Sequence, residues 1–179
     1  WTMPGQIATL VVAVVDLETG TVEYVTAGHP PPFFLVPGEG VVWGRLLGSP
    51  PLGLPSQGVV AGTTTIGPGG ALVLYSDGIT EQHDADGDMF GFERTERLVH
   101  DGGDGEMLVD RCVAALSAFS GALEQEDDVT LVALERRTRP ASGQRVSFTV
   151  DSVPGRGTTF RVTLPRNEAA PPNSAGETS

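Results

Sequence analysis

The hydrophobic positions of the chain fall into short runs separated by clusters of Gly, Pro and Asp. Residues 7–15 are rich in Val, Leu and Ala, and residues 21–26 alternate apolar with polar side chains. A turn carrying Asp16 and Gly20 separates these two runs, which is the pattern of a β-hairpin. The same criterion predicts three further strands, at residues 33–36, 59–66 and 71–74. This part of the chain is therefore expected to be antiparallel β structure.

Beyond these strands the hydrophobic spacing changes to the period of a helix. Residues 92–100 predict a short helix, and residues 106–119 predict a longer one with an apolar face that should lie on a sheet. Cys112 lies on this face with no base beside it in sequence, so it is expected to be a packed core side chain rather than a nucleophile. Residues 101–105 match the D-x-G-x-G pattern of a nucleotide lid, but no strand precedes them, which favours a linker between two helices. Residues 129–134 predict another strand.

The C-terminal part of the chain differs in composition from the rest. Two strand-like runs surround a Pro-Gly turn, and the last residues are rich in Pro, Ala, Ser and Glu, which is typical of disorder. The expected organisation is a main domain, a linker, a β-hairpin and a disordered tail, at residues 1–136, 137–144, 145–165 and 166–179.

Composition bounds the size and the class of the protein. At 179 residues the chain is long enough for one ordinary core, and its 24 Gly and 14 Pro favour short strands and turns. The net charge of −12 argues against a duplex nucleic-acid binder, which needs a basic surface to contact phosphates. The single cysteine excludes an internal disulfide, so the expected compartment is the cytoplasm.

No membrane segment or signal peptide is expected. The longest apolar run, residues 7–15, is too short to cross a bilayer, and the N-terminus lacks the basic region of a signal peptide. The chain starts at Trp1 and enters a strand almost at once, so an incomplete domain is expected.

Two strands each carry carboxylates at one end. Asp77 and Gly78 follow the apolar run 71–74 closely, and Asp127 and Asp128 stand just before the strand at 129–134. A carboxylate at a strand end can face solvent or a metal ion, so these two places are the candidate metal ligands.

A third acidic segment carries aspartates at alternate positions, as in a calcium-binding EF-hand loop. Asp84, Asp86 and Asp88 supply this spacing, but Met89 stands where the loop needs glycine and Thr95 where it needs glutamate. A solvated acidic loop is therefore the favoured interpretation, with calcium binding as the alternative.

Five motifs in order resemble the metal-dependent PPM-type serine/threonine phosphatases, in the SpoIIE/RsbU-like branch. They span roughly residues 7–136 and lie at residues 25–32, 47–48, 74–81, 90–91 and 127–131. The resemblance implies an α+β fold that is part of an α-β-β-α sandwich of antiparallel sheets flanked by helices. It also implies two Mn²⁺ or Mg²⁺ ions that activate a water for attack on phosphoserine or phosphothreonine. The implied substrate is a phosphorylated regulator in bacterial signalling, such as an anti-sigma-factor antagonist.

The resemblance assigns roles to individual residues. Asp77 and Asp127 match the metal-ligand aspartates, and Asp128 stands where the wider family often has Asn. Gly78 would allow a close backbone approach, and Thr130 would orient the acidic turn. For His29 a loop-stabilising role is favoured over that of an acid catalyst.

The start of the chain differs from the family. The Gly-Gly-Asp motif and the following Asp that bridge both metals in the family have no counterpart in residues 1–24. Two carboxylates are too few to hold two divalent ions against water, so the isolated chain is expected to bind manganese weakly and to be nearly inactive.

The tail shows a second resemblance. Residues 148–165 are similar to the closing hairpin of a histidine-kinase-type (GHKL) ATPase domain, whose ATP-binding residues lie in segments that this chain lacks. ATP binding is therefore not expected, and the simpler interpretation is two strands that extend the main sheet or lie loose. The alternatives to a phosphatase are a non-catalytic interaction module derived from the same domain, or a fragment of a sensor kinase/phosphatase fusion.

Overall fold

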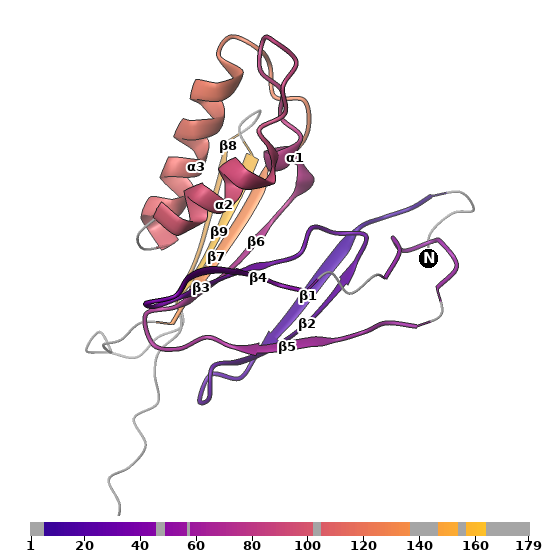
Figure 1. Ribbon diagram of the computed structural model, residues 1–179, viewed down its shortest axis with the longest axis vertical. Coiled ribbons are helices and arrows are strands. Elements are labelled where there is room, and N and C mark those ends of the chain that lie inside the picture. Colours follow the sequence, from indigo (N-terminus) through magenta and orange to yellow (C-terminus); the bar gives the residue numbers. More distant parts are fainter. Residues whose placement is uncertain are drawn as a thin grey trace, which may run out of the picture.

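Two β-sheets form the framework of the protein (Figure 1). The computed structural model describes residues 6–45, 49–56, 58–101, 105–136, 147–153 and 157–163. One sheet has three antiparallel strands in the order β1-β2-β5, with bounds Leu10–Val15, Thr21–Ala27 and Gly62–Thr65. Gly20 ends the turn between β1 and β2 with φ of 78°, a conformation that glycine adopts without the strain of a Cβ.

The second sheet has six strands in the order β4-β3-β6-β7-β9-β8. Their bounds are Gly40–Trp43, Phe33–Val36, Ala71–Tyr75, Thr130–Glu135, Gly157–Thr163 and Ser147–Val153. Neighbouring strands are antiparallel except β7 and β9, which run parallel. The β8–β9 hairpin therefore extends the main sheet.

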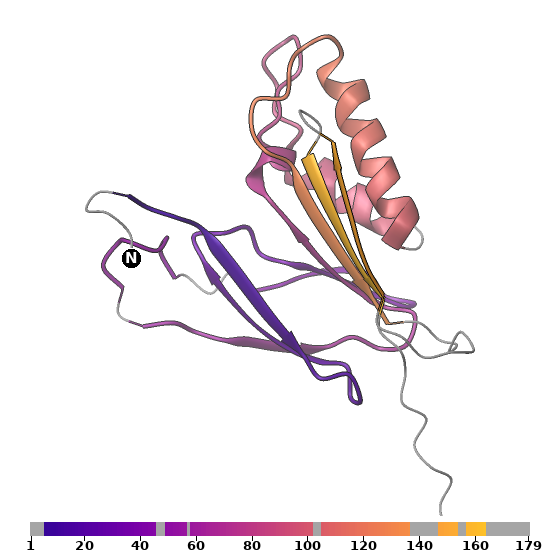
Figure 2. The ribbon, with the colours of Figure 1, turned by 180° about the vertical axis from the view of Figure 1, so that it is seen from behind.

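The helices lie on one side of the six-stranded sheet. They are the short α1 at Asp77–Thr80, α2 at Gly91–Asp101 and α3 at Gly105–Ser120. Helix α2 contacts β3 and β4, and α3 contacts β7 and β9. Figure 2 shows the same separation from behind, with β1 and β2 on the other side of this sheet from α3. No helix in the described ranges is long and apolar enough to cross a bilayer.

Two hydrophobic clusters hold these layers together. The larger one lies between the six-stranded sheet and the helices and centres on Phe33, Tyr75 and Ile79. The smaller one joins the two sheets through Val22, Tyr24, Phe34, Ile66 and Leu72. Because successive strand residues point to opposite faces, neighbours such as Phe33 and Phe34 contribute to different clusters.

The structure confirms the α+β class, the first hairpin and both predicted helices. The strand expected at residues 59–66 is shorter, because it pairs with β2 only over Gly62–Thr65, and Val59 and Val60 are exposed. Strand β4 was not predicted, and the parallel pairing of β9 departs from the antiparallel pattern. Predictions for residues 47–48, the linker and the disordered tail concern segments outside the described residues.

Candidate metal centre

The two predicted carboxylate sites lie at the same end of β6 and β7, two neighbouring central strands of the six-stranded sheet. This end of the sheet, with Asp77 and Asp127, is called the corner below. Strands β6 and β7 are antiparallel, with Tyr75 opposite Leu131. The end of β6 therefore lies beside the start of β7. Asp77 follows β6 and Asp127 precedes β7, so the sheet topology brings them to the same corner from positions 50 residues apart in sequence.

Ser76 joins the two strand ends through three hydrogen bonds. Its backbone N–H donates to the Thr130 carbonyl at 2.9 Å, and its hydroxyl donates to the Asp128 carbonyl at 2.9 Å. The same hydroxyl oxygen accepts the Thr130 N–H at 2.9 Å. The Ser76 side chain thus fixes the start of α1 against the acidic turn at residues 125–128.

Gly78 provides the close approach that this arrangement needs. A Cβ built on Gly78 would lie 2.6 Å from the Asp128 carbonyl oxygen, well inside the distance that real Cβ atoms keep. The obstructing atom belongs to the backbone and cannot rotate away. Only glycine therefore lets α1 lie against the acidic turn without displacing it.

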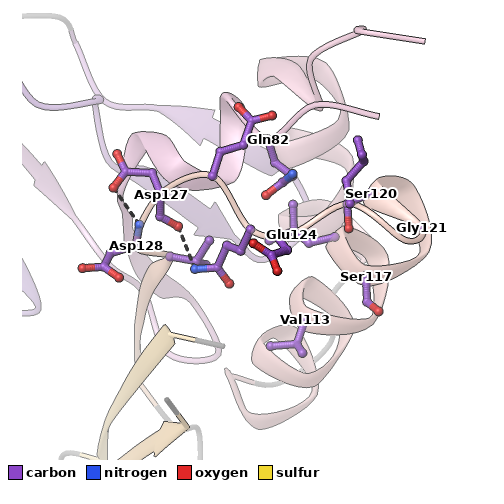
Figure 3. Close-up of a pocket in the computed structure, with 13 residues that line it drawn as sticks. Gln82, Val113, Ser117, Ser120, Gly121, Glu124, Asp127 and Asp128 are labelled. Carbon is purple, nitrogen blue, oxygen red and sulfur yellow. Dashed lines mark hydrogen bonds between the residues drawn. The ribbon is translucent and has the colours of Figure 1, made fainter. Parts of the chain in front are cut away.

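The acidic turn is also closed by its own residues. The Asp127 carboxylate accepts the Asp128 N–H at 2.7 Å, and the Gln125 amide donates to the Asp127 carbonyl at 2.7 Å (Figure 3). The Thr130 side chain makes no hydrogen bond to the described part of the chain, so its backbone, held by Ser76, orients this turn. One carboxylate oxygen of Asp127 stays free of this turn.

His29 approaches the corner from the other sheet. It follows β2, and Gly28 turns the chain there with φ of 66° while its N–H donates to the Ser49 carbonyl at 2.9 Å. The His29 Nδ1 lies 3.2 Å from the Thr9 hydroxyl. Burial lowers the pKa of the imidazole, whereas the Tyr75 backbone and the Asp77 carboxylate act to raise it. Burial is the largest of these effects, so the pKa of His29 lies below its usual value.

The donor type of this corner suits a hard divalent cation, but the donor number is low. Asp77 and Asp127 offer carboxylate oxygens, the ligands that Mn²⁺ and Mg²⁺ prefer. Among the described residues, no three His, Cys, Asp or Glu side chains form a group that could hold a metal ion. The corner therefore fits part of a divalent-metal site and not a complete one.

Two other candidates, the acidic loop at residues 84–88 and Cys112, are not part of this corner. The Asp84 carboxylate accepts the N–H groups of Asp86 at 3.0 Å and of Asp88 at 2.9 Å, so the acidic loop is a self-capped turn. Cys112 is 3% exposed in the core beneath α3, as expected, and burial raises the pKa of its thiol to about 12. Ser76 carries no signal in the sequence beyond its place between Tyr75 and Asp77, and its role was not predicted.

Known proteins are similar to this chain in sequence and in fold. A sequence model of the family described as Stage II sporulation protein E (SpoIIE) matches residues 2–137. Protein IcfG of Synechocystis is 30% identical over 131 residues, which is 72% of this chain and 20% of that protein.

Solved structures give the same result at the level of the fold. The RsbU and RsbW domains of Rv1364c from Mycobacterium tuberculosis match with TM-score 0.59 and 26% identity, covering 74% of this chain and 38% of that one. The SpoIIE phosphatase domain of Bacillus subtilis matches with TM-score 0.56 and 19% identity, covering 75% and 59%. The SiaA-PP2C domain of Pseudomonas aeruginosa matches with TM-score 0.54 and 22% identity, covering 63% and 45%.

This chain thus spans about a fifth of the curated relative and less than two thirds of each of these solved chains. The family match nevertheless covers most of its sequence, including both aspartates of the corner and His29. The chain belongs to the Stage II sporulation protein E (SpoIIE) family.

Proposed function

We propose that this chain is the C-terminal part of a metal-dependent phosphatase domain that hydrolyses phosphoserine or phosphothreonine on a regulatory protein. The observation that carries this proposal is the corner at which Asp77 and Asp127 are held together by Ser76 and Gly78. Ser76 bonds to the backbone of Asp128 and Thr130, and Gly78 lets α1 lie against the Asp128 carbonyl, so both aspartates are carried to the same end of the sheet. Carboxylates that converge from two segments are the kind of ligands that a hard divalent cation takes.

Asp77 and Asp127 would supply part of the ligand set for Mn²⁺ or Mg²⁺, with Asp128 beside them. When bound, two such ions acidify a water and neutralise phosphate oxygens. The further ligands would come from outside the described residues, where the family carries a Gly-Gly-Asp motif. Burial holds the pKa of His29 below its usual value, which reduces the positive charge that this histidine could set against a bound cation.

The proposed substrate is a phosphoprotein of bacterial signalling, such as an anti-sigma-factor antagonist, met in the cytoplasm. Support for a regulator comes from the solved relative that contains RsbU and RsbW domains. The chain's net charge of −12 suits a partner with basic side chains.

A second candidate function is a non-catalytic interaction module that retains the fold without the metal site. The absence of a three-residue ligand group among the described residues favours it. The coding sequence upstream of Trp1 discriminates between the two. A Gly-Gly-Asp motif there supports the enzyme, and its absence supports the binding module.

The direct test is phosphatase activity on a phosphorylated anti-sigma-factor antagonist with Mn²⁺ present. In a protein that includes the upstream part of the domain, Asp77→Asn and Asp127→Asn should each lower kcat/KM by about 100-fold or more, because each removes a charge needed to hold the ions. Asp86→Asn, in the acidic loop, is the matched control and should leave activity unchanged. Activity that survives both corner substitutions rules out the assignment.

A further inference from the structure

A pocket of about 720 Å³ lies beside the acidic turn. It is lined by residues from the C-terminal half of α3, by residues 121 and 123–129, and by Gln82 (Figure 3). Asp127 borders both this pocket and the corner with Asp77. The volume is in the range of pockets that take one side chain or a small ligand.

The polar groups of the pocket are mostly hydrogen-bond acceptors. Four carboxylates line it, from Glu124, Glu126, Asp127 and Asp128, and none of its lining residues is Lys or Arg. Arg94 belongs to the nearby α2, but its guanidinium donates to the carbonyls of Met89 and Phe90 and lies 4.8 Å from the Phe119 ring centroid. That cation is thus already engaged.

Gln82 adds a further acceptor to the pocket. This residue is only 4% exposed, and its backbone carbonyl accepts the Phe90 N–H at 2.8 Å, so its position is fixed. Its amide nitrogen donates to the His83 carbonyl at 3.2 Å, whereas Oε1 accepts no hydrogen bond from any described residue. Figure 3 shows the amide projecting into the space between the acidic segment and α3. This oxygen is not fully buried, so a donor in the pocket would take the place of water there.

The walls of the pocket are tied together. His83 Nδ1 lies 2.9 Å from Glu126 Oε2, which joins the loop after α1 to the acidic segment. Val113, Leu116, Leu123 and Val129 supply the apolar part of the lining. A lining that combines apolar side chains with several acceptors matches an aliphatic stem that ends in a cationic, donor-only group.

We propose that this pocket binds an arginine or lysine side chain of the phosphoprotein substrate. The inference rests on the proposed function, because Asp127 places the pocket beside the corner where the phosphoryl group would be held. The basic residue would lie within a few positions of the phosphoserine. The pocket would therefore select substrates by the positive charge of this basic residue, in addition to the phosphoryl group.

Binding of labelled peptides to the chain tests this proposal, because it needs no catalytic turnover. The probes are phosphoserine heptapeptides with arginine at each position in turn, their citrulline counterparts, and the unphosphorylated arginine peptides. Two-dimensional amide NMR titration reports both the affinity and the residues that respond. The best arginine peptide should bind about fivefold tighter than its citrulline counterpart, with shifts at Gln82 and Glu124. A lysine peptide should keep most of this gain.

Two conservative substitutions make the test specific. Glu124→Gln removes one pocket charge at an exposed position and should reduce the preference for arginine to about twofold or less. Glu93→Gln removes a charge from the exposed face of α2 outside the pocket and should leave the preference intact. Equal affinity for arginine and citrulline, an unchanged preference in Glu124→Gln, or shifts confined to other surfaces would overturn the proposal.

A separate measurement keeps this proposal apart from the phosphatase function. If arginine is preferred but the protein that includes the upstream part of the domain shows no phosphatase activity with Mn²⁺ present, the pocket stands and the function proposed for the corner fails. If phosphorylation strengthens binding but arginine does not, the corner stands and the pocket proposal is wrong.

Discussion

At the scale of single residues, Gly78 shows how little room the corner leaves. Its missing side chain lets α1 touch the Asp128 backbone, with 2.6 Å between a hypothetical Cβ and the carbonyl oxygen. Gly78→Ala should therefore lower the free energy of unfolding by about 1 to 3 kcal/mol, through backbone displacement. Urea unfolding measures this. Gly67→Ala is the control, because a Cβ there meets nothing within 4 Å, and an equal loss at both positions would contradict the explanation.

Cys112 allows a second test at this scale. Because burial raises the pKa of its thiol to about 12, the side chain is protonated and shielded at neutral pH. A thiol reagent at pH 8 should modify the native chain at least about 100-fold more slowly than the chain unfolded in urea. Rapid modification of the native chain would show that α3 does not pack as described.

The sequence predicts some of these residues and not others, for a physical reason. Asp77 and Asp127 are visible because each stands beside a hydrophobic run, and a strand end is a local pattern. Ser76 and Gln82 are not visible, because their roles depend on the register of β6 with β7 and on how residues 82–90 close. Such pairings between distant segments leave no mark in a single stretch of sequence.

At the scale of elements, Arg136 connects the two sheets. Its guanidinium donates to the carbonyls of Glu18 at 2.7 Å, Thr19 at 2.7 Å and Ile66 at 2.8 Å, from the end of β7 to the β1–β2 turn and the end of β5. Gly20 leaves the space that the guanidinium occupies. The apolar side chains of the smaller cluster add contacts between the same two sheets.

Arg136→Lys should destabilise the fold although it keeps the charge. A lysine ammonium cannot reproduce the planar fork that reaches three carbonyls, and a loss of about 1 to 3 kcal/mol is expected. Thermal unfolding measures the effect, with Arg97→Lys on the exposed side of α2 as the matched control. An unfolding temperature equal to that of the control variant would show that the sheets are held by apolar packing alone.

Elements with a clear hydrophobic pattern were predictable from the sequence. The first hairpin, α2 and α3 follow from the spacing of their hydrophobic residues. Strand β4 has only four residues and begins at Gly40, and it is stabilised by Trp43, whose ring centroid lies 4.5 Å from that of Phe33. The parallel pairing of β9 with β7 could not be predicted, because alternating polar and apolar residues indicate a strand but not its partner or direction.

At the scale of the whole molecule, the described chain has helices on one side only. The outer face of the three-stranded sheet exposes Leu10, Val12 and Val14, at 41%, 43% and 63%. This chain covers 45%, 59% and 38% of the three solved relatives, so each of them has further segments that this chain does not match.

Manganese binding to this chain tests the central claim most directly, namely that Asp77 and Asp127 together form part of a divalent-metal site. Electron paramagnetic resonance of free Mn²⁺ counts the bound ion without requiring catalysis. The expected result is one weak site with a dissociation constant on the order of 1 mM, lost in Asp77→Asn and in Asp127→Asn but retained in Asp86→Asn. Binding that survives both corner substitutions, or that disappears with Asp86→Asn, would contradict the claim.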